Sequence, residues 1–193
     1  MGDESLFNRY AIALLSLAIE KKEVANFRYE VKQIADILKN NREFAMILND
    51  SNYNLEEKYK IVEKVFASIN PDILSFTKII IRNGRAFYLY EIFKETLFRF
   101  DDYLNIEEGV FYCVSSMKDE DIKKAIAAVE KKLNKRVECE IIRDDTLIGG
   151  FKLVVKDNVF DASLKKKLER LKESVKKWGA YYANKTKWNQ FFD

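Results

Sequence analysis

The spacing of apolar residues changes near Gly109, and this change constrains the fold more than any other feature of the sequence. Up to about residue 106, apolar residues recur at helical spacing between short polar turns. After Gly109 they run continuously or alternate, as they do in buried or half-buried strands. We therefore predict an α+β protein with a helical domain at 1–107, an α/β domain at 108–178 and an aromatic C-terminal extension at 179–193.

The first part of the chain predicts six short helices packed as an antiparallel bundle. Asn54 is a suitable cap for one helix, with Glu56 and Glu57 in its first turn. Pro71 suits the start of the next helix, because its missing N–H has no partner there. Asn83-Gly84 suits the end of that helix. The predicted ranges are 4–21, 23–40, 42–48, 55–69, 72–83 and 86–106.

The second part predicts a βαββα order with a small mixed sheet. The run 110–114 indicates a buried strand, and 118–133 returns to helical spacing. Alternating residues around Cys139 and Leu153 indicate two more strands. The last helix is predicted over 161–178. The first two strands are expected to be parallel, because a helical crossover joins them.

Several classes of catalytic site are excluded by the residues that the chain lacks. The chain has no histidine, which excludes His-dependent triads and most zinc sites. Gly149-Gly150 lacks the spacing of the nucleotide-binding fingerprints. The acidic pairs Asp101-Asp102 and Asp144-Asp145 fall at predicted helix ends or turns, where they are expected to be solvated. We predict no catalytic residues, no metal site, no cofactor and no small-molecule substrate.

The two cysteines, Cys113 and Cys139, are expected to be reduced core residues. A disulfide between them is the alternative if their strands are neighbours. No segment approaches the roughly 18 consecutive apolar residues that span a bilayer. The N-terminus lacks the basic region of a secretory signal.

Charge is distributed unevenly over the two parts of the chain. The net charge is +3, with 15 Lys and Arg against 16 Asp and Glu over 1–106. Over 161–187 there are 9 basic residues against 3 acidic ones. One hypothesis is therefore an adaptor whose basic helix binds nucleic acid or another acidic partner.

The predicted helix at 4–21 is apolar on nearly every side, because its polar residues Ser5, Arg9, Ser16 and Glu20 fall close to one line. The helix at 72–83 is similar. A surface helix of a small bundle needs a narrower apolar stripe. Either both helices are fully surrounded, or they flank each other and leave an apolar groove that accepts a partner helix.

Several segments of the first part resemble one family. The run 9–14, Arg-Tyr-Ala-Ile-Ala-Leu, is similar to the opening of the delta subunits of F-type ATP synthases and of the mitochondrial oligomycin-sensitivity conferral protein. Leu55-Glu56-Glu57-Lys58 resembles the start of that family's fourth helix. Asn83-Gly84-Arg85 resembles its "ENGR" turn, with Arg82 in place of the usual acid.

The most specific resemblance lies in the second part. The run 145–152, Asp-Thr-Leu-Ile-Gly-Gly-Phe-Lys, and the residues after it are similar to the family's "L-I-G-G … D-x-V-x-D-G-S" segment, with Ala162 in place of the glycine. The resemblance covers residues 7 to about 177. Two glycines permit a tight turn, and Asp161 or Ser163 can cap the last helix. A structural role is expected for Leu147, Ile148, Gly149, Gly150, Asp161 and Ser163.

The resemblance implies a non-catalytic stator subunit of the peripheral stalk, at the cytoplasmic face of the cell membrane as part of the complex. In that family the helical domain binds N-terminal helices of alpha subunits, and the C-terminal domain holds the end of the b subunit. The joint resists rotor torque, and no nucleic acid takes part. The residues expected to contact the alpha helix are Tyr10, Ala13, Leu14, Leu17, Phe76, Ile79, Ile80 and Asn83.

The extension at 179–193 carries five aromatic residues. Gly179 is expected to let the chain leave the helix. We expect the extension to pack on the C-terminal domain or to reach along the b subunit, with Tyr181, Trp188 and Phe192 as anchors.

Overall fold

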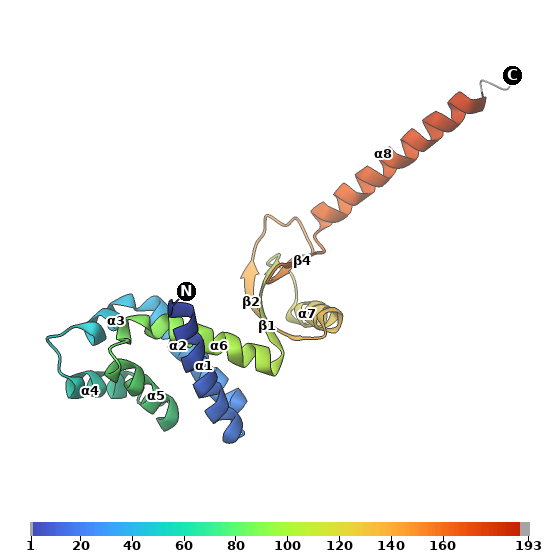
Figure 1. Cartoon of the computed structure of the whole chain (residues 1–193). Coiled ribbons are helices and arrows are strands. Elements are labelled where there is room, and N and C mark those ends of the chain that lie inside the picture. The colour runs from blue at the N-terminus through green and yellow to red at the C-terminus, as the bar shows by residue number, and fades with distance from the viewer. Residues whose placement is uncertain (1, 190–193) are drawn as a thin grey trace. The chain divides into compact units, whose positions relative to one another are not determined.

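A computed structural model describes the backbone of residues 2–189 and the side chains of residues 5–177. The described chain divides after Asn105 into two compact units, one helical and one built around a sheet (Figure 1). Mixed α+β structure is therefore confirmed. Each unit has its own apolar core, so each is described by itself.

The helical unit contains six α-helices and one short 3₁₀ turn. Both predicted helix starts are present. Asn54 accepts a hydrogen bond from the Glu57 backbone N–H at 3.0 Å, and Glu57 accepts one from the Asn54 N–H at 2.9 Å. Asn70 caps the next helix, ahead of Pro71. The elements are α1 (Gly2–Glu20), α2 (Val24–Asn40), α3 (Arg42–Asn49), α4 (Leu55–Val65), α5 (Pro71–Arg82), the turn η1 (Ala86–Tyr88) and α6 (Leu89–Leu104).

Helix α6 lies at the centre of this unit and packs against α1 and α2. Its buried side chains Ile92, Phe93 and Phe100 are fully excluded from solvent. An ion pair between Arg28 of α2 and Asp101 of α6 joins two helices inside this packing, with both side chains largely buried. A buried charge needs such a partner, because an unpaired charge in the interior is costly.

The helix predicted over 86–106 is shorter than expected at both ends. Residues 86–88 form the 3₁₀ turn, and α6 ends at Leu104. Asn105 then takes a left-handed conformation with φ +58°, and its N–H bonds to the Asp101 and Asp102 carbonyls. Asparagine tolerates this conformation better than most residues. Ile106 consequently begins a strand, where the prediction placed the last residue of a helix.

The second unit holds a four-stranded mixed sheet, so the predicted three-strand order was one strand short. Its elements are β1 (Ile106–Cys113), α7 (Asp119–Leu133), β2 (Arg136–Arg143), β3 (Phe151–Val155) and β4 (Asn158–Asp161). The strand order is β2-β1-β3-β4. Strands β1 and β2 are parallel, as predicted, while β3 pairs antiparallel with β1 and β4. The missed strand β4 has four residues and follows the tight turn in which Lys156 has φ +47°.

Helix α7 packs on one face of this sheet (Figure 1). Ile122 and Val129 of α7 meet Phe111 and Leu153 from the two central strands. Cys113 lies in the same core, and both cysteines are free thiols. The disulfide alternative is wrong, because the register sets Cys139 opposite Gly109, four positions from Cys113. Burial, followed by the charge of Glu130, raises the pKa of the Cys139 thiol to about 11.

Glu107 of β1 is a buried carboxylate held by two lysines. Lys135, just before β2, donates to its Oε1 at 2.5 Å, and Lys156, in the β3–β4 turn, lies 2.5 Å from its Oε2. Burial raises the pKa of Glu107, but the hydrogen bonds and charges of the lysines outweigh it, so the pKa lies below its ordinary value of 4.5. The carboxylate therefore ties β1 to the residue before β2 and to the β3–β4 turn at one end of the sheet.

We expect Glu107→Gln to lower the free energy of unfolding of the second unit by about 2 kcal/mol at neutral pH, because the variant loses both charge partners. The folded pKa lies below the unfolded one, so this stabilisation is present above the unfolded pKa and is lost as pH falls through the folded pKa. Urea unfolding of both proteins at pH 7 and pH 3 measures the difference. An equal difference at both pH values would contradict this account.

Helix α8 (Leu164–Asn189) is longer than the predicted helix at 161–178. It begins three residues later, after β4, and continues through Gly179, so the expectation that Gly179 ends the helix is wrong. A glycine inside a helix costs only about 1 kcal/mol, which the flanking helix formers offset. The side chains of the predicted extension lie outside those that the structure describes, and residues 190–193 lie outside it entirely.

Candidate subunit-binding site

Helices α1 and α5 are joined at two levels, which sets them antiparallel. Lys21, directly after α1, forms an ion pair with Asp72 in the first turn of α5. Near the other end, Asn83 after α5 donates a hydrogen bond to the Tyr10 hydroxyl at 3.0 Å. The predicted site residues Tyr10 and Asn83, 73 positions apart, are therefore in contact. Between the two levels lies a surface that we call the α1–α5 face: Tyr10, Ala13, Leu17, Ile79 and Asn83.

Tyr10 connects the polar and apolar parts of this face. Its hydroxyl also accepts a hydrogen bond from Arg85 at 2.7 Å, and the Arg85 guanidinium lies 5.5 Å from the centre of its ring. The Tyr10 and Phe76 rings pack in a T-shaped pair, with 5.9 Å between their centroids. Arg85 was not among the predicted binding residues. The signal that could have identified it is its place in the Asn83-Gly84-Arg85 turn.

The eight residues predicted to bind the partner fall into two groups. Leu14, Phe76 and Ile80 are buried in the core of the helical unit, with Leu14 only 1% exposed. Ala13, Ile79 and Asn83 are exposed, and Tyr10 and Leu17 are half-buried. The first group supports the face from beneath, and the second is accessible to a partner.

Neither helix is fully surrounded. Ile12 of α1 and Ile79 of α5 are exposed, at 49% and 42%. Two surface hollows of about 760 and 260 Å³ lie elsewhere on the unit, around α3, and none of the eight predicted residues lines either one.

The segment from Leu147 to Ser163 fastens the start of α8 to the sheet. Leu164 donates its backbone N–H to the Gly149 carbonyl at 2.9 Å, and Ala162 donates to Phe151 at 2.9 Å. Gly150 has φ +82°, and a Cβ there would lie 2.4 Å from the Ala162 carbonyl oxygen. Only glycine fits this approach. Leu147 is half-buried, and Ile148, with φ +42°, is exposed at the tip of the turn.

Ser163 is the cap of α8, which decides between the two predicted candidates. Its hydroxyl accepts a hydrogen bond from the Lys166 N–H at 3.2 Å, and its side chain is buried. Asp161 in turn accepts from the Ser163 N–H at 2.9 Å. Hydrogen bonds from Ser163 hold the pKa of the Asp161 carboxyl below its usual value. These residues organise the backbone around the start of α8.

Within the described residues, no three Cys, Asp or Glu side chains gather as metal ligands would. No described helix combines the length and apolar character that crossing a membrane requires.

The family model for the ATP synthase delta (OSCP) subunit matches residues 6–175. ATP synthase subunit delta of Mycoplasma capricolum is 32% identical over 175 residues, which covers 89% of this chain and 97% of the relative. The ATP synthase subunit delta of Bacillus mycoides is 28% identical, and the alignment covers 92% of this chain and 99% of the relative. These matches give no support to the alternative of a nucleic-acid adaptor.

The fold has a counterpart among solved structures. A chain of the cryo-EM structure of the Toxoplasma gondii mitochondrial ATP synthase hexamer aligns with a TM-score of 0.59. The alignment covers 88% of this chain and 97% of that chain. At 18% sequence identity, this likeness shows a shared fold alone. Sequence and fold agree, and the chain belongs to the ATP synthase delta (OSCP) subunit family, as a non-catalytic component of the peripheral stalk of an F-type ATP synthase.

Proposed function

We propose that this protein joins the catalytic headpiece to the peripheral stalk by using its two units as separate attachment points. The helical unit, as an antiparallel six-helix bundle, binds the N-terminal helix of an alpha subunit. The second unit binds the C-terminal segment of the membrane-anchored b subunit, on the cytoplasmic face of the membrane. A joint of this kind holds the headpiece against rotor torque.

The observation that carries the first attachment is the α1–α5 face. Two of its exposed members suit a helix contact, since Ile79 offers a side chain to bury and the small Ala13 lets a partner backbone approach closely. Tyr10, Asn83 and Arg85 give polar groups at one end. An amphipathic helix that buries its apolar face against such a surface would be fixed in register by the polar end.

The test is Ile79→Asp, measured with a fluorescent peptide from the N-terminus of the alpha subunit, titrated with the full chain. We expect the affinity to fall by about tenfold or more, because the new carboxylate would be buried without a partner. Ile47→Asp on α3 is a matched control, since Ile47 is also 42% exposed but lies outside the α1–α5 face. The affinity of the Ile47→Asp variant for the peptide should stay within about twofold of that of the wild type. Equal loss in both variants, or in neither, would reject the assignment of this face.

A further inference from the structure

The described part of α8 carries a narrow apolar seam that the described residues of its unit leave largely exposed. Every residue from 164 to 177 is exposed. The apolar ones among them lie at a spacing of four, three and four residues, which places them along one line of a helix. They are Leu164, Leu168, Leu171 and Val175, with exposures of 46% to 70%.

This spacing is the heptad pattern of a two-stranded coiled coil. With Leu168 and Val175 at position a, Leu164 and Leu171 occupy position d. The other residues of 164–177 are all polar or charged, so the apolar stripe is limited to a and d. A helix that lies in a lipid interface needs a wider apolar face. The pattern therefore favours a helix as the partner.

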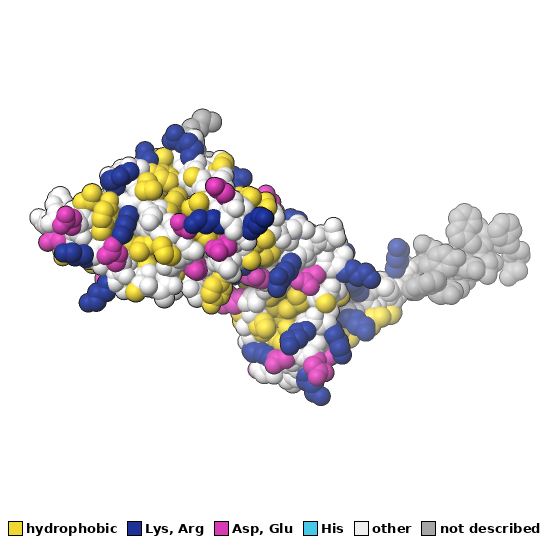
Figure 2. Space-filling view, turned by 90° about the horizontal axis from the view of Figure 1, so that it is seen from below, with side chains coloured by type: hydrophobic (Ala, Val, Ile, Leu, Met, Phe, Trp, Pro, Cys, Tyr) yellow, Lys and Arg dark blue, Asp and Glu magenta, His cyan; other side chains and the backbone are white. Residues whose placement is uncertain are grey.

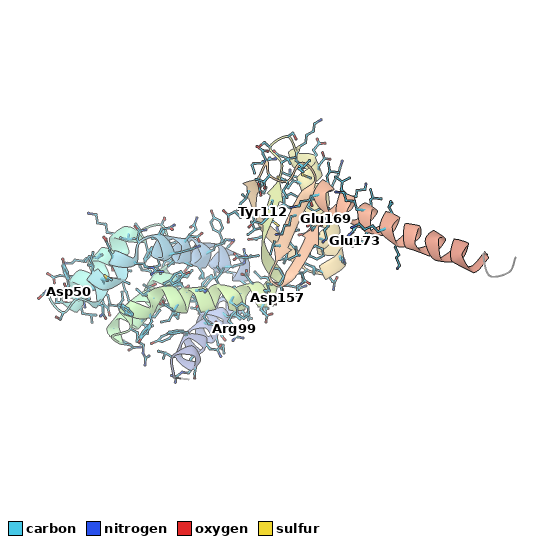
Figure 3. The ribbon with its side chains drawn as sticks, turned by 90° about the horizontal axis from the view of Figure 1, so that it is seen from above. Asp50, Arg99, Tyr112, Asp157, Glu169 and Glu173 are labelled. Carbon is cyan, nitrogen blue, oxygen red and sulfur yellow. The ribbon has the colours of Figure 1, made fainter. Side chains whose placement is uncertain are left out.

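The charged residues beside the seam indicate which charges the partner helix should carry. The flanking e and g positions hold Lys165, Lys167 and Lys172, and only Ser174 is uncharged. Figure 2 shows Lys and Arg side chains beside hydrophobic ones around this part of the molecule. The two acids, Glu169 and Glu173, labelled in Figure 3, fall at positions b and f, away from the seam.

A second copy of the chain does not fit this surface. Parallel pairing of two α8 helices would set Lys167 against Lys172 of the other copy, and antiparallel pairing would also set lysine against lysine. Like charges at these positions destabilise a pair of helices. A partner with Glu or Asp at its own e and g positions would turn each of these repulsions into an attraction.

We propose that the α8 seam forms a two-stranded coiled coil with an amphipathic partner helix whose flanking positions are acidic. This proposal rests on the proposed function in one respect, since it takes the C-terminal segment of the b subunit to be that helix. Ser163 and the turn around Gly150 then serve the interaction, because they fix where α8 begins relative to the sheet.

The experiment uses the full chain and two designed heptad peptides that are identical except for Glu or Lys at positions e and g. We expect the Glu peptide to bind at least about tenfold more tightly than the Lys peptide. Replacing Lys165, Lys167 and Lys172 with Glu should reverse this preference. Replacing Lys166, Arg170 and Lys177 with Glu gives a control with the same change in net charge on the far side of the helix, and it should keep the original preference. Circular dichroism checks that both variants retain their helix content.

Three results would overturn the proposal. Equal binding of both peptides would remove the role of the flanking lysines. An equal loss of affinity for the Glu peptide in the two triple variants would indicate general attraction of the basic helix to anions. Titration with RNA and with phosphatidylserine vesicles would then identify a nucleic acid or a membrane as the ligand. Binding of the b segment that both triple variants retain in full would place the b site elsewhere and leave the proposed function intact. Failure of the b segment to bind even the wild type, with the Glu peptide bound as expected, would contradict the function and not the seam.

Discussion

Gly150→Ala should strongly destabilise the second unit. The added Cβ would lie 2.4 Å from the Ala162 carbonyl oxygen and 3.0 Å from the Ser163 Cα, and both are backbone atoms that cannot rotate away. The residue would also keep φ at +82°, which L-residues other than glycine rarely adopt. We expect a loss of about 3 kcal/mol or more in the free energy of unfolding, measured by denaturant titration.

Gly84→Ala separates the two contributions to this effect. Gly84 also has a positive φ of +68°, but no heavy atom beyond its chain neighbours lies within 4 Å of the position that its Cβ would take. The Gly84→Ala variant should therefore lose only about 1–2 kcal/mol in the free energy of unfolding, the penalty for a positive φ in a residue with a Cβ. This loss should fall on the helical unit. If both variants lose the same stability, the close approach at Gly150 is not what the turn requires.

Leu14→Asp should unfold the helical unit, whereas Ala13→Asp should leave it folded. The two residues are neighbours in α1, but Leu14 is 1% exposed and Ala13 is exposed. A carboxylate at position 14 would be buried without a partner, and the core would lose the packing of the leucine side chain. We expect the free energy of unfolding to fall by about 4 kcal/mol or more. Thermal unfolding followed by circular dichroism measures the difference. A folded Leu14→Asp variant would mean that α1 does not face the core as the structure shows.

The Ala13→Asp variant also tests whether the α1–α5 face binds the alpha subunit. Ala13→Asp keeps the unit folded, so a loss of affinity for the peptide of the alpha subunit in this variant reports the contact itself. Unchanged affinity would place the partner away from α1.

Local signals in the sequence predicted the features that depend on a few neighbouring residues. The cap at Asn54 and the start of α5 at Pro71 follow from which backbone groups lack partners at a helix end. The parallel pairing of β1 and β2 follows from the helical connection between them. These features needed no knowledge of distant contacts.

The missed elements depend on tertiary contacts or on weak local preferences. Strand β4 has four residues and exists because β3 presents a free edge to it. The end of α6 depends on one asparagine that adopts a left-handed conformation. Helix α8 passes through Gly179, because a single glycine costs only about 1 kcal/mol and the Lys residues before it and the Ala and Lys residues after it favour the helix.

The site shows the same division. A helix that is apolar on nearly every side does not reveal which side faces the core, so the sequence could not separate buried Leu14 from exposed Ala13. It did bring Tyr10 and Asn83 into one predicted site, and the structure places them in contact. Arg85 stands in the Asn83-Gly84-Arg85 turn of the sequence, but its contact with the Tyr10 hydroxyl is seen only in the structure.

In the function that we propose, one chain holds two partners at once through separate units. The direct measurement immobilises the C-terminal segment of the b subunit, captures the full chain on it and then adds the N-terminal peptide of the alpha subunit. We expect the captured chain to bind the peptide with the affinity of the free chain, and the peptide not to bind the b segment alone. Release of the chain by the peptide, or failure of the captured chain to bind the peptide, would show that the two units do not hold both partners at once.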